Sequence, residues 1–136
     1  MFSSETKVLI VDDMLTMRKI VRKTVFDLGL KNTVEAPDGA AAWAEVEKTF
    51  STNTPFQLII SDWNMPVLTG IELLKKVRSN EKTRNVPFVF LTADSEKNQI
   101  LEAMKLGVTT YILKPFTPAT FKEKLEIAYQ SSLKST

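Results

Sequence analysis

The stretch Val8-Leu9-Ile10-Val11-Asp12-Asp13 decides the fold, and Leu58-Ile59-Ile60-Ser61-Asp62 repeats its pattern further along the chain. Each begins with an apolar run of the kind that forms a strand buried on both faces, as in a parallel sheet. The carboxyl ends of parallel strands meet at one edge of the sheet, where open α/β sheets bind ligands. We therefore expect three carboxylates to converge there. Converging carboxylates repel one another unless a hard cation such as Mg²⁺ or an ammonium group offsets their charge, so the pattern predicts an acidic metal site.

The composition excludes several classes of protein and site. The chain has 136 residues, of which 43% are hydrophobic and 25% are charged, as expected for one soluble globular domain. Its net charge of +2 is too small to predict binding to nucleic acid. It has no cysteine and no histidine, which excludes disulfides, thiolate or imidazole metal sites and histidine-based catalysis. The amino-terminal residues lack the apolar segment of a signal peptide, and no apolar run approaches the roughly 20 residues that span a bilayer, so we expect a cytoplasmic protein without a membrane segment.

Short apolar runs alternate along the chain with amphipathic segments. The first helix is predicted from a set of apolar residues with Gly29 as its left-handed stop, namely Met17, Ile20, Val21, Val25 and Leu28. Strands are expected near 8–11, 33–36, 56–61, 86–91 and 110–113, and the later helices near 40–50, 71–78, 96–106 and from 118 onward. Five βα units in succession predict an α/β fold, a flavodoxin-like (βα)5 doubly wound parallel sheet with the strand order 2-1-3-4-5.

Polar residues after the fourth and fifth expected strands extend the acidic cluster. Thr92 follows the fourth strand and Lys114 the fifth, and the order 2-1-3-4-5 makes strands 1, 3, 4 and 5 consecutive neighbours. Taken singly, an Asp at a strand end is usually a turn or cap residue, Thr92 a helix cap and Lys114 a surface lysine. Together they favour a site in which carboxylates hold Mg²⁺, one carboxylate is a nucleophile, and the hydroxyl and ammonium groups stabilise a transferred phosphoryl group.

Five motifs in order make the chain resemble a known family. They are Val8-Leu9-Ile10-Val11-Asp12-Asp13, Thr16-Met17-Arg18, Ser61-Asp62-Trp63-Asn64-Met65-Pro66, Leu91-Thr92-Ala93 and Tyr111-Ile112-Leu113-Lys114-Pro115-Phe116-Thr117. The chain resembles the receiver domains of two-component response regulators, and most of all the single-domain chemotaxis regulators of the CheY type. Because the resemblance runs from about Lys7 to Tyr129, residues 1–136 are expected to form a single receiver domain.

The resemblance implies a role for each residue of the expected site. Asp62 would be the phosphoacceptor, and Mg²⁺ would be held by Asp12, Asp13, Asp62 and the backbone carbonyl of Asn64. Thr92 and Lys114 would contact the phosphoryl group, and the peptide between Lys114 and Pro115 would be cis.

The resemblance also implies a switch and a means of setting the phosphoryl lifetime. Thr92 and Tyr111 would couple phosphorylation to a small rearrangement. Asn64 and Asp94 would tune how water attacks the phosphoryl group. Asp94 stands where the chemotaxis relatives often carry Glu, which puts the lifetime and any dependence on a CheZ- or CheX-type phosphatase in question. Trp63, next to the acceptor, is expected to be an exposed residue at the edge of the site.

Two partners follow from the same resemblance. A CheA-like histidine kinase would donate the phosphoryl group, which suits a chain without histidine of its own. The phosphorylated protein, a monomer, would then bind a FliM-like flagellar motor switch protein and control rotation, through a surface that includes Lys97, Ile100, Tyr111 and Lys124. It would be a signalling protein that catalyses its own phosphorylation and dephosphorylation, not an enzyme acting on a metabolite.

Other functions compete with this interpretation. A stand-alone receiver that works as an adaptor in a phosphorelay outside chemotaxis would carry the same site. A Mg²⁺-dependent aspartyl-phosphate hydrolase fits poorly, because Asp62-Trp63-Asn64 lacks the second acid of the Asp-x-Asp motif of haloacid dehalogenase-like phosphatases. An adaptor that needs no phosphorylation is disfavoured by the complete set of site residues.

Overall fold

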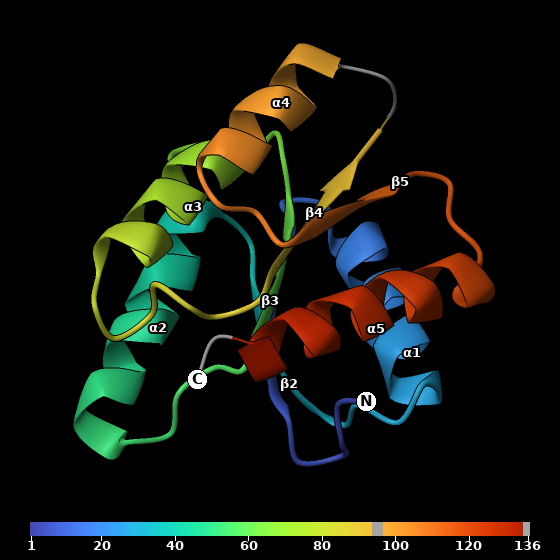
Figure 1. The fold of residues 1–136 in the computed structure, drawn as a ribbon, viewed down its shortest axis with the longest axis horizontal. Helices are drawn as coiled ribbons and strands as arrows, with labels where there is room; N and C mark the ends of the chain where they lie inside the picture. Colours follow the sequence, from blue (N-terminus) through green and yellow to red (C-terminus); the bar gives the residue numbers. More distant parts are fainter. Residues whose placement is uncertain (94–96, 135–136) are drawn as a thin grey trace.

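The computed structural model describes residues 1–93 and 97–134 as one parallel sheet flanked by helices (Figure 1). The strands are β1 (Lys7–Val11), β2 (Asn32–Ala36), β3 (Leu58–Asp62), β4 (Phe88–Thr92) and β5 (Thr110–Leu113). The helices are α1 (Leu15–Asp27), α2 (Gly39–Thr52), α3 (Gly70–Ser79), α4 (Lys97–Lys105) and α5 (Pro118–Lys134). The strand order is β2-β1-β3-β4-β5, so the predicted flavodoxin-like topology is confirmed.

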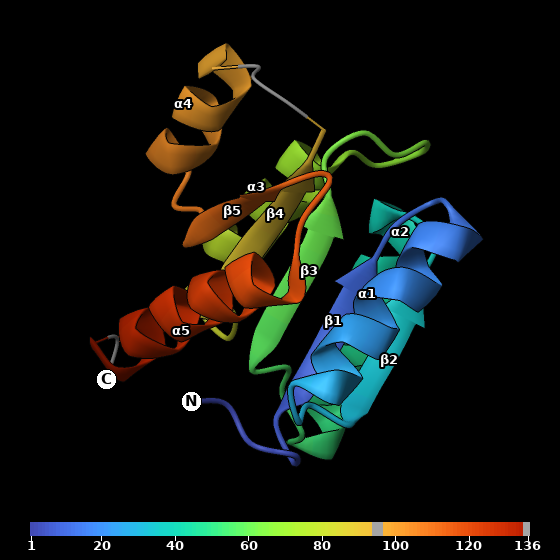
Figure 2. The ribbon, with the colours of Figure 1, turned by 90° about the vertical axis from the view of Figure 1, so that its right-hand side faces the viewer.

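Two hydrophobic layers cover the two faces of the sheet. Figure 2 shows α1 and α5 on the face turned toward the viewer, with α2 and α3 behind the sheet. Ala103 of α4 belongs to the layer of α2 and α3. Side chains alternate between the layers along each strand, as the pleat requires. Val8 and Ile10 of β1 belong to the layer of Val21 and Phe121, the buried residues of α1 and α5. Leu9 and its partners on the opposite face pack with α2 and α3.

The ends of the elements differ from the sequence predictions in ways that the pairing explains. β3 and β4 begin two residues later than expected, at Leu58 and Phe88, and run on to include Asp62 and Thr92. Asp62 is paired with Leu91 in the ladder, and this pairing keeps it within the strand. The left-handed stop at Gly29 is confirmed, with a φ of 99°.

The predicted apolar face of α1 was too wide. Val21 and Val25 are buried, and Met17 and Leu28 pack partly against the same layer. Ile20 is wrong as a core residue, because it is 50% exposed. The buried positions follow one another by three or four residues, and Ile20 lies about 100° around the helix from Val21, outside that stripe.

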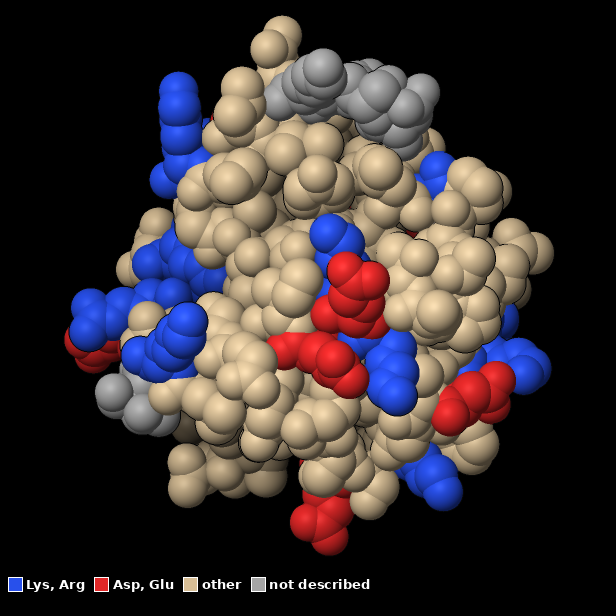
Figure 3. All heavy atoms as spheres, turned by 45° about the vertical axis from the view of Figure 1, so that its right-hand side comes forward, with Lys and Arg blue, Asp and Glu red and all other residues tan. Residues whose placement is uncertain are grey.

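Charged side chains of both signs are mixed on the surface. On the face shown in Figure 3, Lys and Arg side chains lie among Asp and Glu side chains and uncharged residues. This mixture fits the net charge of +2. Among the helices of the described residues, none combines the length and the hydropathy needed to cross a membrane.

Gly70, the first residue of α3, lets the chain turn back directly under β3. Its N–H donates a hydrogen bond to the carbonyl oxygen of Trp63, 3.0 Å away. A β-carbon at this position would overlap the carbonyl oxygen of Asp62 and lie 2.7 Å from the ring of Phe90. Because neither a strand carbonyl nor a buried ring can move freely, only glycine fits here.

We expect the substitution Gly70→Ala to destabilise the protein by about 3 kcal/mol, because the added methyl group overpacks the end of β3. Gly29→Ala is the matched control, since a β-carbon there meets nothing within 4 Å and only the positive φ is unfavourable, a cost of roughly 1 kcal/mol. Urea unfolding followed by circular dichroism measures both. Equal losses in the two variants would contradict the close approach at Gly70.

Candidate functional site

The structure brings the carboxylates of Asp12, Asp13 and Asp62 together at the carboxyl edge of the sheet. One carboxylate oxygen of each residue lies within 4.8 Å of those of the other two. The convergence arises because β1 and β3 are hydrogen-bonded neighbours whose ends are aligned, with Val11 opposite Ser61. Asp12 is buried, Asp62 is partly buried and Asp13 is exposed, so the cluster is open to solvent on one side.

Asp12 carries an incompletely satisfied buried carboxylate. Its Oδ1 accepts a hydrogen bond from the N–H of Met14 at 2.8 Å, while its Oδ2 has no hydrogen-bond partner within the described part of the chain. Burial raises the pKa of Asp12 above its ordinary value, the Met14 N–H lowers it, and the neighbouring Asp62 carboxylate raises it again. A buried oxygen in this state is free to bind a cation, and three carboxylates form the oxygen donor set that Mg²⁺ prefers.

Lys114 supplies the ammonium of the cluster. It follows β5, and its backbone N–H donates to the carbonyl oxygen of Thr92 at 2.8 Å. Its Nζ donates to Asp62 Oδ1 at 3.2 Å and lies 3.7 Å from Asp12 Oδ2. The peptide between Lys114 and Pro115 is cis, as the resemblance implied. The ammonium therefore lies between the two carboxylates that stand furthest inside the site.

The Asp62 carboxylate is held on one side. Its Oδ1 accepts a second hydrogen bond, from the backbone N–H of Trp63 at 2.8 Å. Since both donors reach Oδ1, Oδ2 is the oxygen left to react. A hollow of about 260 Å³ opens at the site and is lined by Asp13, Met14, Asp62, Trp63, Asn64, Thr92, Ala93, Gln99 and Lys114.

The hollow contains residues that the sequence did not single out. Gln99 of α4 and Met14 both line it. Met14 acts through its backbone N–H, which gives no signal in the residue type, and Gln99 reaches the site only because α4 folds over the end of β4. Thr92, which the sequence did predict, is buried and lines the same hollow.

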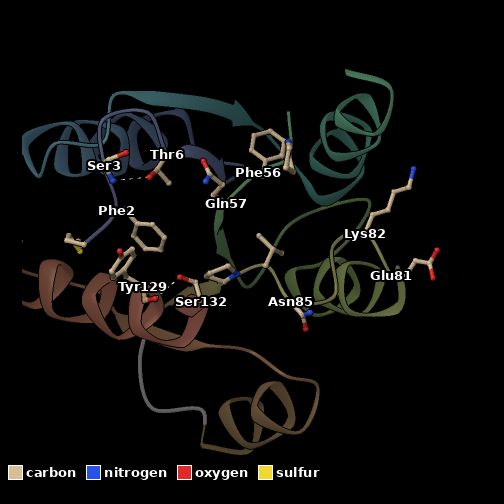
Figure 4. A pocket seen from close by; sticks show the side chains of 14 residues that line it. Phe2, Ser3, Thr6, Phe56, Gln57, Glu81, Lys82, Asn85, Tyr129 and Ser132 are labelled. Carbon is tan, nitrogen blue, oxygen red and sulfur yellow. Dashed lines mark hydrogen bonds between the residues drawn. The ribbon is translucent and has the colours of Figure 1, made fainter. Parts of the chain in front are cut away.

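Hollow size alone would have pointed away from the acids, because larger hollows lie elsewhere, one of them about 650 Å³ beside Met1 and the second half of α5. A hollow of about 530 Å³ lies at the amino edge of the sheet, where Thr6, Gln57 and Pro87 precede their strands. Figure 4 shows Phe2 and Tyr129 facing each other there, and their rings make an edge-on contact with centroids 5.2 Å apart. Because the clustered acids and the lysine lie at the opposite edge, the chemistry belongs to the smaller hollow.

Trp63 is buried, so the expectation of an exposed residue was wrong. Only 6% of its surface is exposed, and its ring centroid lies 4.6 Å from that of Phe90. The cause is the turn that follows it. The hydrogen bond from Gly70 to the Trp63 carbonyl draws the loop back over β4 and places the indole against the core.

The loop between β3 and α3 carries the exposed Asn64 and contains a strained residue, Val67. Val67 has a φ of 68°, in the left-handed region that a β-branched residue rarely adopts. The N–H of Leu68 donates to the carbonyl oxygen of Pro66 around it, and the Leu68 carbonyl accepts from Gly39 at the start of α2. These hydrogen bonds keep the strained turn in place in the loop that follows Asp62.

The residues predicted for partner binding come from α4, β5 and α5. Lys97 is the first residue of α4, Ile100 and Tyr111 are partly buried, and Lys124 Nζ lies 5.1 Å from the centre of the Tyr111 ring. Leu101 and Met104 of α4 are exposed and add apolar surface. Asp94, predicted to tune the phosphoryl lifetime, lies outside the described residues.

Comparison with known proteins fits this geometry. Residues 8–126 match the model of the response regulator receiver domain. The chain belongs to this family. It is 45% identical to the chemotaxis protein CheY-3 of Vibrio cholerae over 91% of this chain and 92% of that protein. Its identity to the chemotaxis protein CheY of Pseudomonas aeruginosa is 44%, over 91% of this chain and 96% of that protein.

A solved structure shows the same likeness. The structure of CheY4 of Vibrio cholerae matches with a TM-score of 0.79 and 36% identity, covering 89% of this chain and 96% of that one. The chain is thus a CheY-like receiver, a response regulator of two-component signalling, and its relatives support a role in chemotaxis.

Without metal, we expect Asp12→Asn to stabilise the protein at neutral pH by roughly 1 kcal/mol, because the neutral amide removes a buried charge that the Asp62 carboxylate repels. The pKa of Asp12 is higher in the folded protein than its ordinary value of 3.8. The protonated carboxyl group therefore contributes stability that is fully present below pH 3.8 and is lost as the pH rises through the folded-state pKa. The advantage of the variant should therefore shrink toward acidic pH. Urea unfolding in the presence of a chelator, across a pH series, measures the difference.

The exposed Asp27 of α1 supplies the control, and Asp27→Asn should bring no gain. Addition of Mg²⁺ should reverse the order by stabilising the wild type more than Asp12→Asn. If Asp12→Asn were less stable than the wild type at neutral pH without metal, the inference that the ionised Asp12 carboxylate costs stability would be wrong.

Proposed function

We propose that this CheY-like receiver is a phosphorylation-activated chemotaxis regulator that accepts a phosphoryl group on Asp62 from a CheA-like histidine kinase. The observation that carries the proposal is the position of the Lys114 ammonium, 3.2 Å from Asp62 and 3.7 Å from Asp12. Lys114 and the Trp63 N–H both donate to Asp62 Oδ1, which leaves Oδ2 to react. The chain has no histidine, so the phosphohistidine must belong to another protein.

The transfer is a direct displacement at phosphorus. Asp62 Oδ2 attacks the phosphorus atom, an O–P bond forms, the bond from phosphorus to the imidazole nitrogen of the kinase breaks, and the ring, protonated on its other nitrogen, leaves as neutral imidazole. Charge develops on the phosphoryl oxygens during this step. Lys114 Nζ and the Thr92 hydroxyl are placed to stabilise it, since both line the hollow.

Asp12, Asp13, Asp62 and the backbone carbonyl of Asn64 would hold Mg²⁺. When bound, the ion supplies further positive charge at the phosphoryl oxygens. The buried Asp12 Oδ2 supports this role, because it lacks a hydrogen bond from the described residues. Dephosphorylation reverses the modification by attack of water on phosphorus, with Asn64 and Asp94 setting how that water is placed.

Phosphorylation would act on the surface formed by α4, β5 and α5. A phosphoryl group on Asp62 offers the Thr92 hydroxyl a new acceptor, and Tyr111 lies opposite Phe90 in the neighbouring strand. The surface of Lys97, Ile100, Tyr111 and Lys124 would then bind a FliM-like motor switch protein in the cytoplasm. Leu101 and Met104 support this choice, because exposed apolar side chains beside lysines suit a short amphipathic peptide with acidic residues.

A receiver that serves as an adaptor in a phosphorelay outside chemotaxis is the alternative. It would use the same chemistry at Asp62, so only the partner distinguishes it. The identities above 40% to chemotaxis proteins favour the chemotaxis role.

We expect a small phosphodonor with Mg²⁺ to form an acyl phosphate on the wild type and to change Trp63 fluorescence, because the indole adjoins Asp62 and is buried against Phe90. Asp62→Asn should abolish both signals. Mass spectrometry after trapping of the acyl phosphate measures the modification directly. Equal behaviour of wild type and variant would overturn the assignment of Asp62.

A FliM-type switch peptide should bind the phosphorylated protein about tenfold more tightly than the unmodified protein, within the usual range of allosteric coupling. Tyr111→Ala should remove most of the difference, while the exposed Lys48 of α2, a helix outside the proposed surface, gives the control Lys48→Ala. Fluorescence anisotropy of a labelled peptide measures the affinities. Binding that does not respond to phosphorylation would favour the adaptor alternative.

A further inference from the structure

Asp12 is held by its backbone as well as by its side chain. Its N–H donates to the carbonyl oxygen of Ala36, at the end of β2, at 3.1 Å. Its carboxylate Oδ1 is fixed by the N–H of Met14. Its carbonyl oxygen accepts a third hydrogen bond, 2.8 Å long, from Nη1 of Arg18 on α1. Among the described residues, Oδ2 has no hydrogen-bond partner, and its nearest charged group is the Lys114 ammonium at 3.7 Å.

Arg18 is itself anchored on a side that faces away from the site. Its Nε donates to Glu35 Oε1 on β2 at 3.2 Å, and its side chain is only 15% exposed. Glu35 also pairs with Lys19 at 3.1 Å and with Arg22 at 3.4 Å. A guanidinium can bridge two acceptors in fixed directions, whereas an ammonium is a single compact charge. Arg18 therefore links β2, the edge strand, to the turn that carries Asp12.

The protonation state of Glu35 fits this arrangement. Burial would raise the pKa of Glu35, but the hydrogen bonds from Lys19 and Arg18 outweigh burial and hold that pKa below its ordinary value. Glu35 is thus ionised at neutral pH, and its charge keeps the Arg18 guanidinium in place. Because Arg18 and Arg22 also contact Glu35, its anchoring role does not depend on the exposed Lys19 alone.

We propose that Arg18 is a positioning residue for the Mg²⁺ site, acting through the carbonyl oxygen of Asp12 with Glu35 as its anchor. The proposal rests on the proposed function, because it assumes that Asp12 is a metal ligand. Arg18 touches neither the metal nor the phosphoryl group. It fixes the turn so that Asp12 Oδ2 faces Asp13 and Asp62, in the way that residues behind metal ligands usually set ligand orientation.

Two other roles for Arg18 predict different results. If Arg18 served only as a nearby positive charge, its removal would strengthen Mg²⁺ binding, because a repulsion would be lost. If it only joined α1 to β2, its removal would lower the free energy of unfolding but leave the Mg²⁺ affinity of the folded protein unchanged. A positioning role alone predicts that Mg²⁺ binding becomes weaker.

The test is a titration with MgCl₂ of the full chain, followed by Trp63 fluorescence well below the unfolding temperature and, separately, by the rise in unfolding midpoint. Arg18→Ala should weaken Mg²⁺ binding about tenfold, within the range found for residues behind metal ligands. Arg18→Lys should fall between wild type and Arg18→Ala, because an ammonium cannot reproduce both hydrogen bonds. Lys23→Ala removes an exposed ion pair from the same helix and should bind as the wild type does.

Glu35→Gln provides a second route that keeps Arg18 itself. It should weaken Mg²⁺ binding less than Arg18→Ala does, and adding it to Arg18→Ala should cause no further loss, because Glu35 acts through Arg18. The proposal would be overturned if Arg18→Ala and Arg18→Lys bound Mg²⁺ with an affinity within twofold of the wild type, or more tightly. The proposed function would remain intact in that case. Absence of any Mg²⁺ response in the wild type would instead overturn the metal site and this proposal together.

Discussion

The charge balance at the carboxyl edge of the sheet is the constraint on which the rest of the structure depends. Three carboxylates whose oxygens lie within 4.8 Å of one another are offset, among the described residues, by the ammonium of Lys114. Asp12 is the critical member, because it is buried and its Oδ2 accepts no hydrogen bond from the part of the chain that the structure describes. An arrangement of this kind costs stability in the resting protein and suits a site where a bound cation supplies the missing positive charge. The function therefore follows from an imbalance that the fold maintains.

The parallel topology is what makes this arrangement possible. Asp12, Asp62 and Lys114 are far apart in the sequence, and each stands at or just after the carboxyl end of β1, β3 or β5. The ladder aligns these ends, with Val11 opposite Ser61, Asp62 opposite Leu91 and Thr92 opposite Leu113. A shift of register by one residue would turn a carboxylate from the edge into one of the two hydrophobic layers. The buried apolar residues of both layers set this register. The register in turn determines which side chains meet at the carboxyl edge of the sheet.

What could be predicted from the sequence was what repeats or clusters in residue type. Apolar runs followed by acids predicted the strands, their order and the convergence of the site, and Gly29 predicted its helix end. Trp63 could not be placed, because its burial depends on the hydrogen bond from Gly70 that folds the loop back onto Phe90. Ile20 was misplaced because helical spacing alone does not tell how wide the buried stripe is. The supports of the acids escaped notice for a different reason: backbone N–H groups and the contact from Arg18 to a carbonyl oxygen leave no pattern in the residue types.

The supports of the site are distributed unevenly, and this asymmetry bears on signalling. On the side of β1, β2 and α1, Asp12 is fixed by Ala36, Met14 and Arg18, and Arg18 is fixed in turn by Glu35. On the side of β4 and α4, Ala103 is the one buried residue among the described side chains of the helix. The hydrogen bond from Arg78 to the Gly107 carbonyl holds the turn that follows it. Under the proposed function, a phosphoryl group added to Asp62 would meet firm resistance toward α1 and little toward α4. Structural change would then be directed to the side of α4, where Leu101 and Met104 are exposed.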